Sequence, residues 1–90
     1  MKLNLEWEEN KRQYQTGETL YLNKIKIASY SWNSSMSKTD PDREGKRWIG
    51  RINLPSLKDK TCYGNTEEII KTRIEITVEN WFKEALTPNQ

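Results

Sequence analysis

The sequence predicts an α+β domain in which an antiparallel sheet of three or four strands packs against one long C-terminal helix. Two patterns lead to this fold class. Apolar and polar residues alternate in several short segments before residue 64, as in half-buried strands, and apolar residues then recur every three or four positions to Leu86, as in a helix. Ninety residues are enough for one domain, so we assign residues 1–90 to a single domain.

The first expected strand lies at the N-terminus. Leu3, Leu5 and Trp7 alternate with polar residues, which is typical of a strand with one buried face. Gly17 then marks a turn. We treat residues 1–24 as an N-terminal strand extension and residues 25–86 as a core of three strands followed by one helix.

A second extended segment runs from Thr19 to Trp32, and its apolar residues change parity. Two sets of side chains face opposite ways: Tyr21, Ile25 and Ile27 on one side, and Leu20, Leu22, Tyr30 and Trp32 on the other. Because a regular strand keeps one parity, the change near Asn23 predicts a bulge or a break. Residues 33–44 are a loop by composition, and the sequence leaves open whether it is functional or only a hairpin tip.

The clearest strand runs from Lys46 to Leu54. Its two faces carry different residues: Trp48, Gly50, Ile52 and Leu54 on one, and Arg47, Ile49, Arg51 and Asn53 on the other. Pro55 ends this strand because it has no N–H to donate. A short strand follows at Thr61–Tyr63, and Gly64 ends it.

The last element is a helix that reaches Leu86. Asn65 and Thr66 are both suitable N-caps, and the acidic residues Glu67 and Glu68 suit the positive end of a helix dipole. The expected buried stripe consists of Ile70, Ile74, Val78, Trp81 and Ala85.

The composition excludes several common catalytic arrangements, although carboxylates could still form an acid/base pair. The chain has no histidine, which excludes Ser-His-Asp and Cys-His arrangements as well as a zinc site built from cysteine and histidine. No phosphate-binding glycine-rich motif occurs, and Cys62 is expected to be a partly buried strand thiol. Asp40, Asp42 and Glu44 lack the spacing of a calcium loop. We therefore predict a protein that is not an enzyme and that needs no metal and no cofactor.

The charge and the hydropathy limit the classes of partner and the cellular location that the sequence suggests. The net charge of +2, from 15 basic and 13 acidic residues, permits nucleic-acid binding without arguing for it. No apolar run approaches the ~20 residues that a membrane-spanning helix needs, and the N-terminus has no signal-peptide core. We expect a cytoplasmic protein that does not bind membranes.

One surface of the expected sheet could recognise a partner. Arg47, Ile49 and Arg51 share the face opposite the buried one, and we place Tyr63 beside them as the fourth partner-binding residue. Guanidinium groups beside an apolar side chain suit contacts to a partner's carboxylates, to phosphates or to bases. The alternative is an ordinary solvated sheet face. Self-pairing of the exposed edge strand Leu3–Trp7 would produce a homodimer, which the sequence also leaves open.

The stretches DREGKRWIGRINLPSL and KDKTCYGNTEEIIKTRIEITVENWFKEAL resemble the HicB-like antitoxin fold over residues 25–86. The residues that carry the resemblance are Asp42, Gly45, Trp48, Pro55, Leu57, Gly64, Thr66, Glu67, Glu68 and Trp81. The resemblance implies a β-β-β-α domain that neutralises a small RNA-cleaving toxin by covering it. The chain departs from the family in its N-terminal extension, in the KDKTC segment, and in having no DNA-binding segment after the helix.

The same element order is similar to the arm-type DNA-binding domain of phage integrases. That resemblance implies a sheet in the DNA major groove with Arg47 and Arg51 as readers. The composition is also like that of small phage and mobile-element proteins that block a partner protein. We expect a non-enzymatic protein-binding domain, an antitoxin or a small inhibitor, with duplex DNA as the alternative partner.

Overall fold

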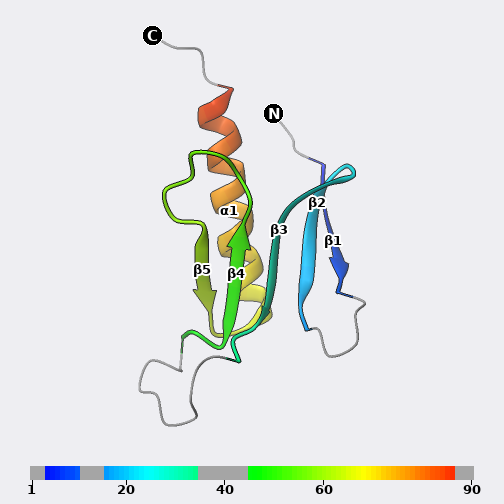
Figure 1. The fold of residues 1–90 in the computed structure, drawn as a ribbon, viewed down its shortest axis with the longest axis vertical. Coiled ribbons are helices and arrows are strands. Elements are labelled where there is room, and N and C mark those ends of the chain that lie inside the picture. Colours follow the sequence, from blue (N-terminus) through cyan, green and yellow to red (C-terminus); the bar gives the residue numbers. More distant parts are fainter. Residues whose placement is uncertain (1–3, 11–15, 35–44, 87–90) are drawn as a thin grey trace.

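The fold was analysed in a computed structural model that describes residues 4–10, 16–34 and 45–86. It contains the strands β1 (Leu5–Glu9), β2 (Glu18–Leu22), β3 (Ile25–Trp32), β4 (Trp48–Ile52) and β5 (Thr61–Gly64), followed by the helix α1 (Glu67–Ala85). The strands form one antiparallel sheet in the order β1-β2-β3-β4-β5 (Figure 1). The predicted α+β class is confirmed, with five strands in place of the expected three or four.

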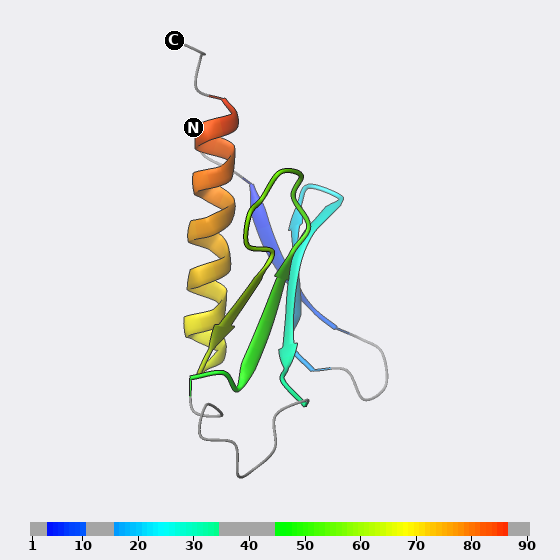
Figure 2. The ribbon, with the colours of Figure 1, turned by 60° about the vertical axis from the view of Figure 1, so that its left-hand side comes forward.

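The N-terminal residues belong to the main sheet. The expected N-terminal strand appears as β1, and β2 follows it in the same sheet, so the segment treated as an extension supplies two of the five strands. Figure 2 shows α1 along one side of this sheet, and no other described helix covers the opposite side. The fold therefore has two layers, a sheet and a helix, with one face of the sheet open.

The change of parity between residues 20 and 32 arises from a turn and a bulge together. Asn23 has a φ of 57°, a left-handed conformation that asparagine tolerates, and it lies in the tight turn between β2 and β3. The register then shifts between Leu20 and Tyr21. Because a bulge puts two successive side chains on the same side of a strand, Ile27 and Ala28 are both buried, at 2% and 1% exposure.

The core lies between the sheet and α1. Its buried apolar residues are Leu20, Ile27, Ala28, Tyr30, Ile52, Leu54, Ile70, Ile74 and Val78. The predicted inward face of β4 is thus confirmed, and so is most of the helix stripe. The end of that stripe differs. Trp81 is half-buried and donates from Nε1 to the carbonyl of Pro55 at 2.9 Å, whereas Ala85 is exposed because the helix extends beyond the sheet.

Thr66 is the N-cap of α1. Its hydroxyl accepts a hydrogen bond from the backbone N–H of Ile69 at 3.2 Å, which satisfies one of the unpaired donors of the first turn. Asn65, the other predicted cap, instead accepts a hydrogen bond from the N–H of Gly45 at 3.3 Å. The start of the helix is therefore encoded locally, by Thr66 and the two glutamates that follow it.

Tyr30 connects strands of the sheet through its ring and reaches the helix through its hydroxyl. The ring is 1% exposed and meets Trp7 and Trp48 edge-on, each with a centroid distance of 5.5 Å. The hydroxyl lies 2.6 Å from Oε2 of Glu18 and 3.1 Å from Oε1 of Glu67, so its one proton is shared between two carboxylates. Lys71 completes the group through an ion pair with Glu18.

These contacts shift two pKa values in opposite directions. Burial and the two carboxylates raise the pKa of Tyr30 far above its ordinary value. Burial also acts to raise the pKa of Glu18, but hydrogen bonds from Lys71 and Tyr30 and the charge of Lys71 outweigh it, so that pKa is lowered. The folded state therefore holds Tyr30 as a neutral donor and Glu18 as an anion.

Two glycines allow α1 to approach the sheet. A Cβ at Gly64 would lie 2.8 Å from the backbone nitrogen of Ile70, and a Cβ at Gly50 would lie 2.7 Å from Cδ1 of Ile74. We predict that Gly64→Ala lowers the free energy of unfolding by about 1–3 kcal/mol because the helix backbone must move. Gly50→Ala should cost less because the end of a side chain can shift. Urea unfolding of both variants measures the difference, and an equal or reversed order would contradict the close helix approach.

We further predict that Tyr30→Phe lowers the free energy of unfolding at pH 7 by about 1.5–3 kcal/mol, because two carboxylates lose their donor. Tyr21→Phe, which changes a half-buried tyrosine of the open face, is the matched control.

The two shifted pKa values also predict how stability depends on pH. The contribution of Tyr30 is complete below its unfolded pKa of about 10 and is lost as the pH rises beyond it, so Tyr30→Phe should flatten the alkaline loss of stability. The contribution of Glu18 is present above its unfolded pKa and is lost as the pH falls through the lower folded value, so Glu18→Gln should flatten the acid side. Urea unfolding across pH tests both arms, and an unchanged alkaline slope in Tyr30→Phe would contradict the assignment.

Candidate functional site

The open face of the sheet is arranged in rows that cross the strands. One row runs Glu8, Thr19, Ser29, Arg51 and Thr61, from β1 to β5. The next row places Ser31, Ile49 and Tyr63 opposite one another on β3, β4 and β5. Because directly opposed residues of an antiparallel pair point to the same face, these side chains share the surface that α1 leaves uncovered.

The structure brings three of the four predicted contact residues together. Ile49 and Tyr63 are directly opposite on β4 and β5 and are both half-buried, and the exposed Arg51 lies two residues along β4. Arg47 is exposed and precedes β4, where its carbonyl accepts a hydrogen bond from the N–H of Asn33 at 2.8 Å. The backbone alternation puts Arg47 on the same side as Ile49, at the end of the patch.

Lys46 is a member of this patch that the strand pattern did not predict. Its Nζ lies 5.3 Å from the centroid of the Tyr63 ring, within the range of a cation–π contact. Lys46 lies two residues before Trp48, the first residue of β4, so strand alternation assigns it to the face opposite Arg47 and Ile49. Only the position of Tyr63 on the neighbouring strand shows why the ammonium group turns toward the open face. We call Lys46, Arg47, Ile49, Arg51 and Tyr63 the β4–β5 patch.

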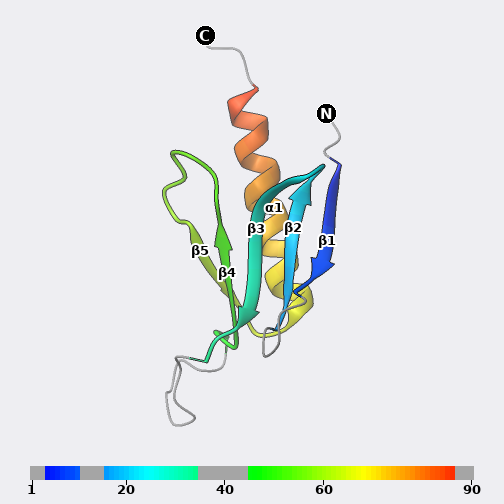
Figure 3. The ribbon, with the colours of Figure 1, turned by 45° about the vertical axis from the view of Figure 1, so that its right-hand side comes forward.

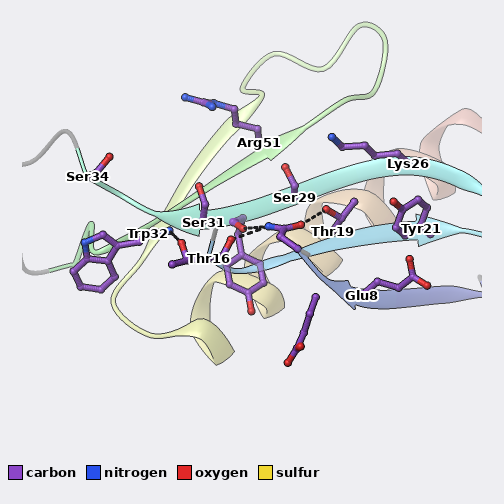
Figure 4. Close-up of a pocket in the computed structure, with 13 residues that line it drawn as sticks. Glu8, Thr16, Thr19, Tyr21, Lys26, Ser29, Ser31, Trp32, Ser34 and Arg51 are labelled. Carbon is purple, nitrogen blue, oxygen red and sulfur yellow. Dashed lines mark hydrogen bonds between the residues drawn. The ribbon is translucent and has the colours of Figure 1, made fainter. Parts of the chain in front are cut away.

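Beside this patch the open face is hollowed. The hollow has a volume of about 890 Å³ and extends over β1, β2 and β3. Figure 4 shows Arg51 and Glu8 on opposite sides of it, with Ser29 and Thr19 between them. Charged residues of both signs, Glu8, Lys26 and Arg51, thus line the hollow together with the polar residues Thr19 and Ser29.

Hydrogen bonds close the floor of the hollow at β2. The hydroxyl of Thr19 donates to Oδ1 of Asn10 at 2.6 Å, and Nδ2 of Asn10 donates to the carbonyl of Thr16 at 2.7 Å. Thr19 is 8% exposed although it lies on the open face, because the Asn10 side chain covers it. In the described part of the chain every buried side-chain nitrogen and oxygen has a hydrogen-bond partner. The polar groups at the floor of the hollow are therefore already hydrogen-bonded within the protein, and the floor has a structural role.

Metal binding and thiol chemistry gain no support from the arrangement. Residues 4–10, 16–34 and 45–86 contain no group of three or more acidic or cysteine side chains that could hold a metal ion. The acidic loop positions Asp40, Asp42 and Glu44 lie outside the described residues. Cys62 is half-buried, as predicted, and lies opposite Gly50 on the helix side. Burial raises the pKa of its thiol, which the charge of Arg73 only partly offsets, so the reactive thiolate is disfavoured.

The described residues include no helix long and apolar enough to cross a membrane. Comparison with known protein families, with curated proteins and with solved structures finds no match to this chain. The likenesses to HicB-like antitoxins and to integrase arm-type domains therefore stay predictions from the sequence.

Proposed function

We propose that this chain is a non-enzymatic protein-binding domain whose β4–β5 patch contacts a partner protein and blocks it, in the manner of a HicB-like antitoxin or a small phage or mobile-element inhibitor. The observation that carries this proposal is the position of Ile49 and Tyr63. They form an apolar and aromatic pair on the sheet face that α1 does not cover, and Arg47, Arg51 and Lys46 surround them.

This combination of residues is typical of interface centres. Tyrosine and arginine are enriched in the few positions that dominate binding energy, and such positions lie among residues that exclude water. Ile49 and Tyr63 are already half-buried, so a partner needs to displace little more water to bury them fully. The cations around them can pair with carboxylates of the partner and fix its orientation.

Duplex DNA is the alternative partner, and the charges of the open face weigh against it. Glu6 and Glu8 on β1 point to the same face as Arg51 on β4. A sheet that lies in a DNA groove brings phosphates close to both ends of each row, so these carboxylates would repel them. A protein with acidic and basic groups of its own has no such conflict.

We predict that affinity purification from the native host at low and at high salt recovers a defined protein partner, and that Arg51→Glu or Tyr63→Ser removes it. Both changed side chains lie on the surface of the sheet, so the variants should keep their fold, as checked by circular dichroism. Lys58→Glu is the matched charge reversal, because Lys58 lies in the loop beside Trp81 on the helix side. It should retain the partner.

Two outcomes would contradict the proposal. The first is a partner whose recovery is the same with Arg51→Glu as with Lys58→Glu. The second is recovery of nucleic acid alone, with an affinity for duplex DNA that falls steeply with salt, about one power of salt concentration per phosphate contact. If the partner is an RNA-cleaving enzyme, an equimolar amount of this chain should stop cleavage, and Arg51→Glu should not.

A further inference from the structure

The sheet ends in two edge strands, and they differ in whether their outward-facing backbone groups are contacted by other described residues. β1 and β5 each pair with one neighbour only, so each has backbone N–H and C=O groups that point away from the sheet. Figure 3 shows β1 at one margin of the sheet and β5 at the other. Such edges can accept an additional strand unless another group occupies them.

The β5 edge is occupied by a side chain of α1. The N–H of Ile52 donates to the carbonyl of Lys60 at 2.8 Å, so the opposed residues Ile52 and Lys60 form a hydrogen-bonded pair. Bonded and non-bonded pairs alternate along an antiparallel ladder, which directs the carbonyl of Tyr63 away from β4. Arg73 of α1 donates a hydrogen bond to this carbonyl. With only four residues and one carbonyl engaged, β5 is a poor template for another strand.

The β1 edge has no comparable cover in the described part of the chain. The N–H of Asn10 donates to the carbonyl of Gly17 at 3.1 Å, and the same alternation then turns the backbone groups of Leu5, Trp7 and Glu9 outward. Within the described residues, 4–10, 16–34 and 45–86, no other backbone group forms a hydrogen bond with these outward groups. β1 therefore offers three donors and three acceptors in extended geometry.

Contacts with α1 also hold β1 in place on the helix side of the sheet. Trp7 donates from Nε1 to Oε1 of Glu75 in α1 at 2.7 Å, and Nζ of Lys71 lies 5.5 Å from the centroid of its ring. These contacts fix the strand against the helix before any partner arrives. A pre-formed edge loses little conformational freedom on binding, which favours affinity.

The acidic side chains of β1 favour an added strand that carries positive charge. Glu6 and Glu8 point to the open face and are exposed, and no described residue forms an ion pair with either of them. In an antiparallel pairing of two β1 strands, the register with Trp7 on the two-fold axis puts Glu6 opposite Glu8 of the second copy. The neighbouring registers put Glu6 opposite Glu6 or Glu8 opposite Glu8. Directly opposed like charges destabilise a strand pair, so the sequence of β1 disfavours a homodimer through this edge.

We propose that the β1 edge accepts an extended basic segment of another protein as a sixth strand. Lysine or arginine at alternate positions of that segment would lie opposite Glu6 and Glu8, and the residues between them would lie beside Leu5 and Trp7 on the helix side. This site is separate from the β4–β5 patch, at the other end of the sheet, so it goes beyond the function proposed above and can fail independently of it.

The test uses the full chain and a fluorescent peptide of alternating lysine and valine. A peptide of alternating glutamate and valine is the control of opposite charge. Fluorescence anisotropy should show that the chain binds the lysine peptide at least about tenfold more tightly than the glutamate peptide. The double variant Glu6→Lys/Glu8→Lys should reverse this preference. Glu79→Lys/Glu84→Lys, on the exposed surface of α1, makes the same change in net charge and should leave the preference intact.

A second variant tests the backbone part of the proposal. Glu9→Pro removes one outward N–H without removing a hydrogen bond to β2, and proline is tolerated on edge strands. It should weaken binding of the lysine peptide about fivefold. Equal weakening by the β1 and α1 charge reversals would overturn the proposal, as would a peptide affinity that Glu9→Pro leaves unchanged. A wild-type dimer that Glu9→Pro dissociates in sedimentation velocity would assign the edge to a second copy instead.

Discussion

The buried side chain of Tyr30 is the interaction on which the rest of the structure depends. Its ring packs edge-on between Trp7 of β1 and Trp48 of β4, and its hydroxyl reaches Glu18 of β2 and Glu67 of α1. With its own place in β3, Tyr30 joins every element except β5. A hydroxyl buried in a core needs hydrogen-bond partners, which Glu18 and Glu67 supply, and Lys71 pairs with Glu18. The Tyr30 hydroxyl therefore has both partners only when β2, β3 and the start of α1 are in place.

This constraint also decides which surfaces remain available. Because the network attaches the start of α1 to β2 and β3, and Glu75 attaches its middle to β1, the helix is held along one face of the sheet, where its backbone lies closest to β3, β4 and β5. The opposite face is left to Arg51, Ile49 and Tyr63. The same attachment draws the first strands into the main sheet, so β1 becomes its margin. The open face and the free edge are thus both consequences of where one helix is held.

Local patterns allowed much of this fold to be predicted. The alternation in β4, the glycine at the end of β5 and the Thr66 cap depend on residues close in sequence, and the structure has all three. The number of strands was underestimated because Thr19–Trp32 was treated as one extended segment, whereas the tight turn at Asn23 divides it into β2 and β3. The Tyr30 network could not be predicted, since its hydroxyl bridges residues 12 and 37 positions away in opposite directions along the chain. Lys46 was missed as a contact of Tyr63 for the same reason, because the pairing of β4 with β5 creates it.

The distribution of charge along the sheet is the reason for proposing a different kind of partner for each of the two surfaces. On the open face, acidic residues lie on β1 and Arg51 and Tyr63 lie on β4 and β5. Thr19 and Ser29 separate Glu8 from Arg51 in one row, and Tyr21 and Lys26 follow Glu6 in the neighbouring row. Duplex DNA, which is negatively charged throughout, suits the basic β4–β5 patch but not the acidic β1 strand. A second copy of β1 paired with the first would place like charges opposite each other. A protein surface of mixed charge can match the β4–β5 patch, while a basic strand can match the β1 edge. Arg73 supports this division because its guanidinium group occupies a backbone carbonyl at the β5 edge, which leaves the acidic β1 edge as the better template for the proposed added strand.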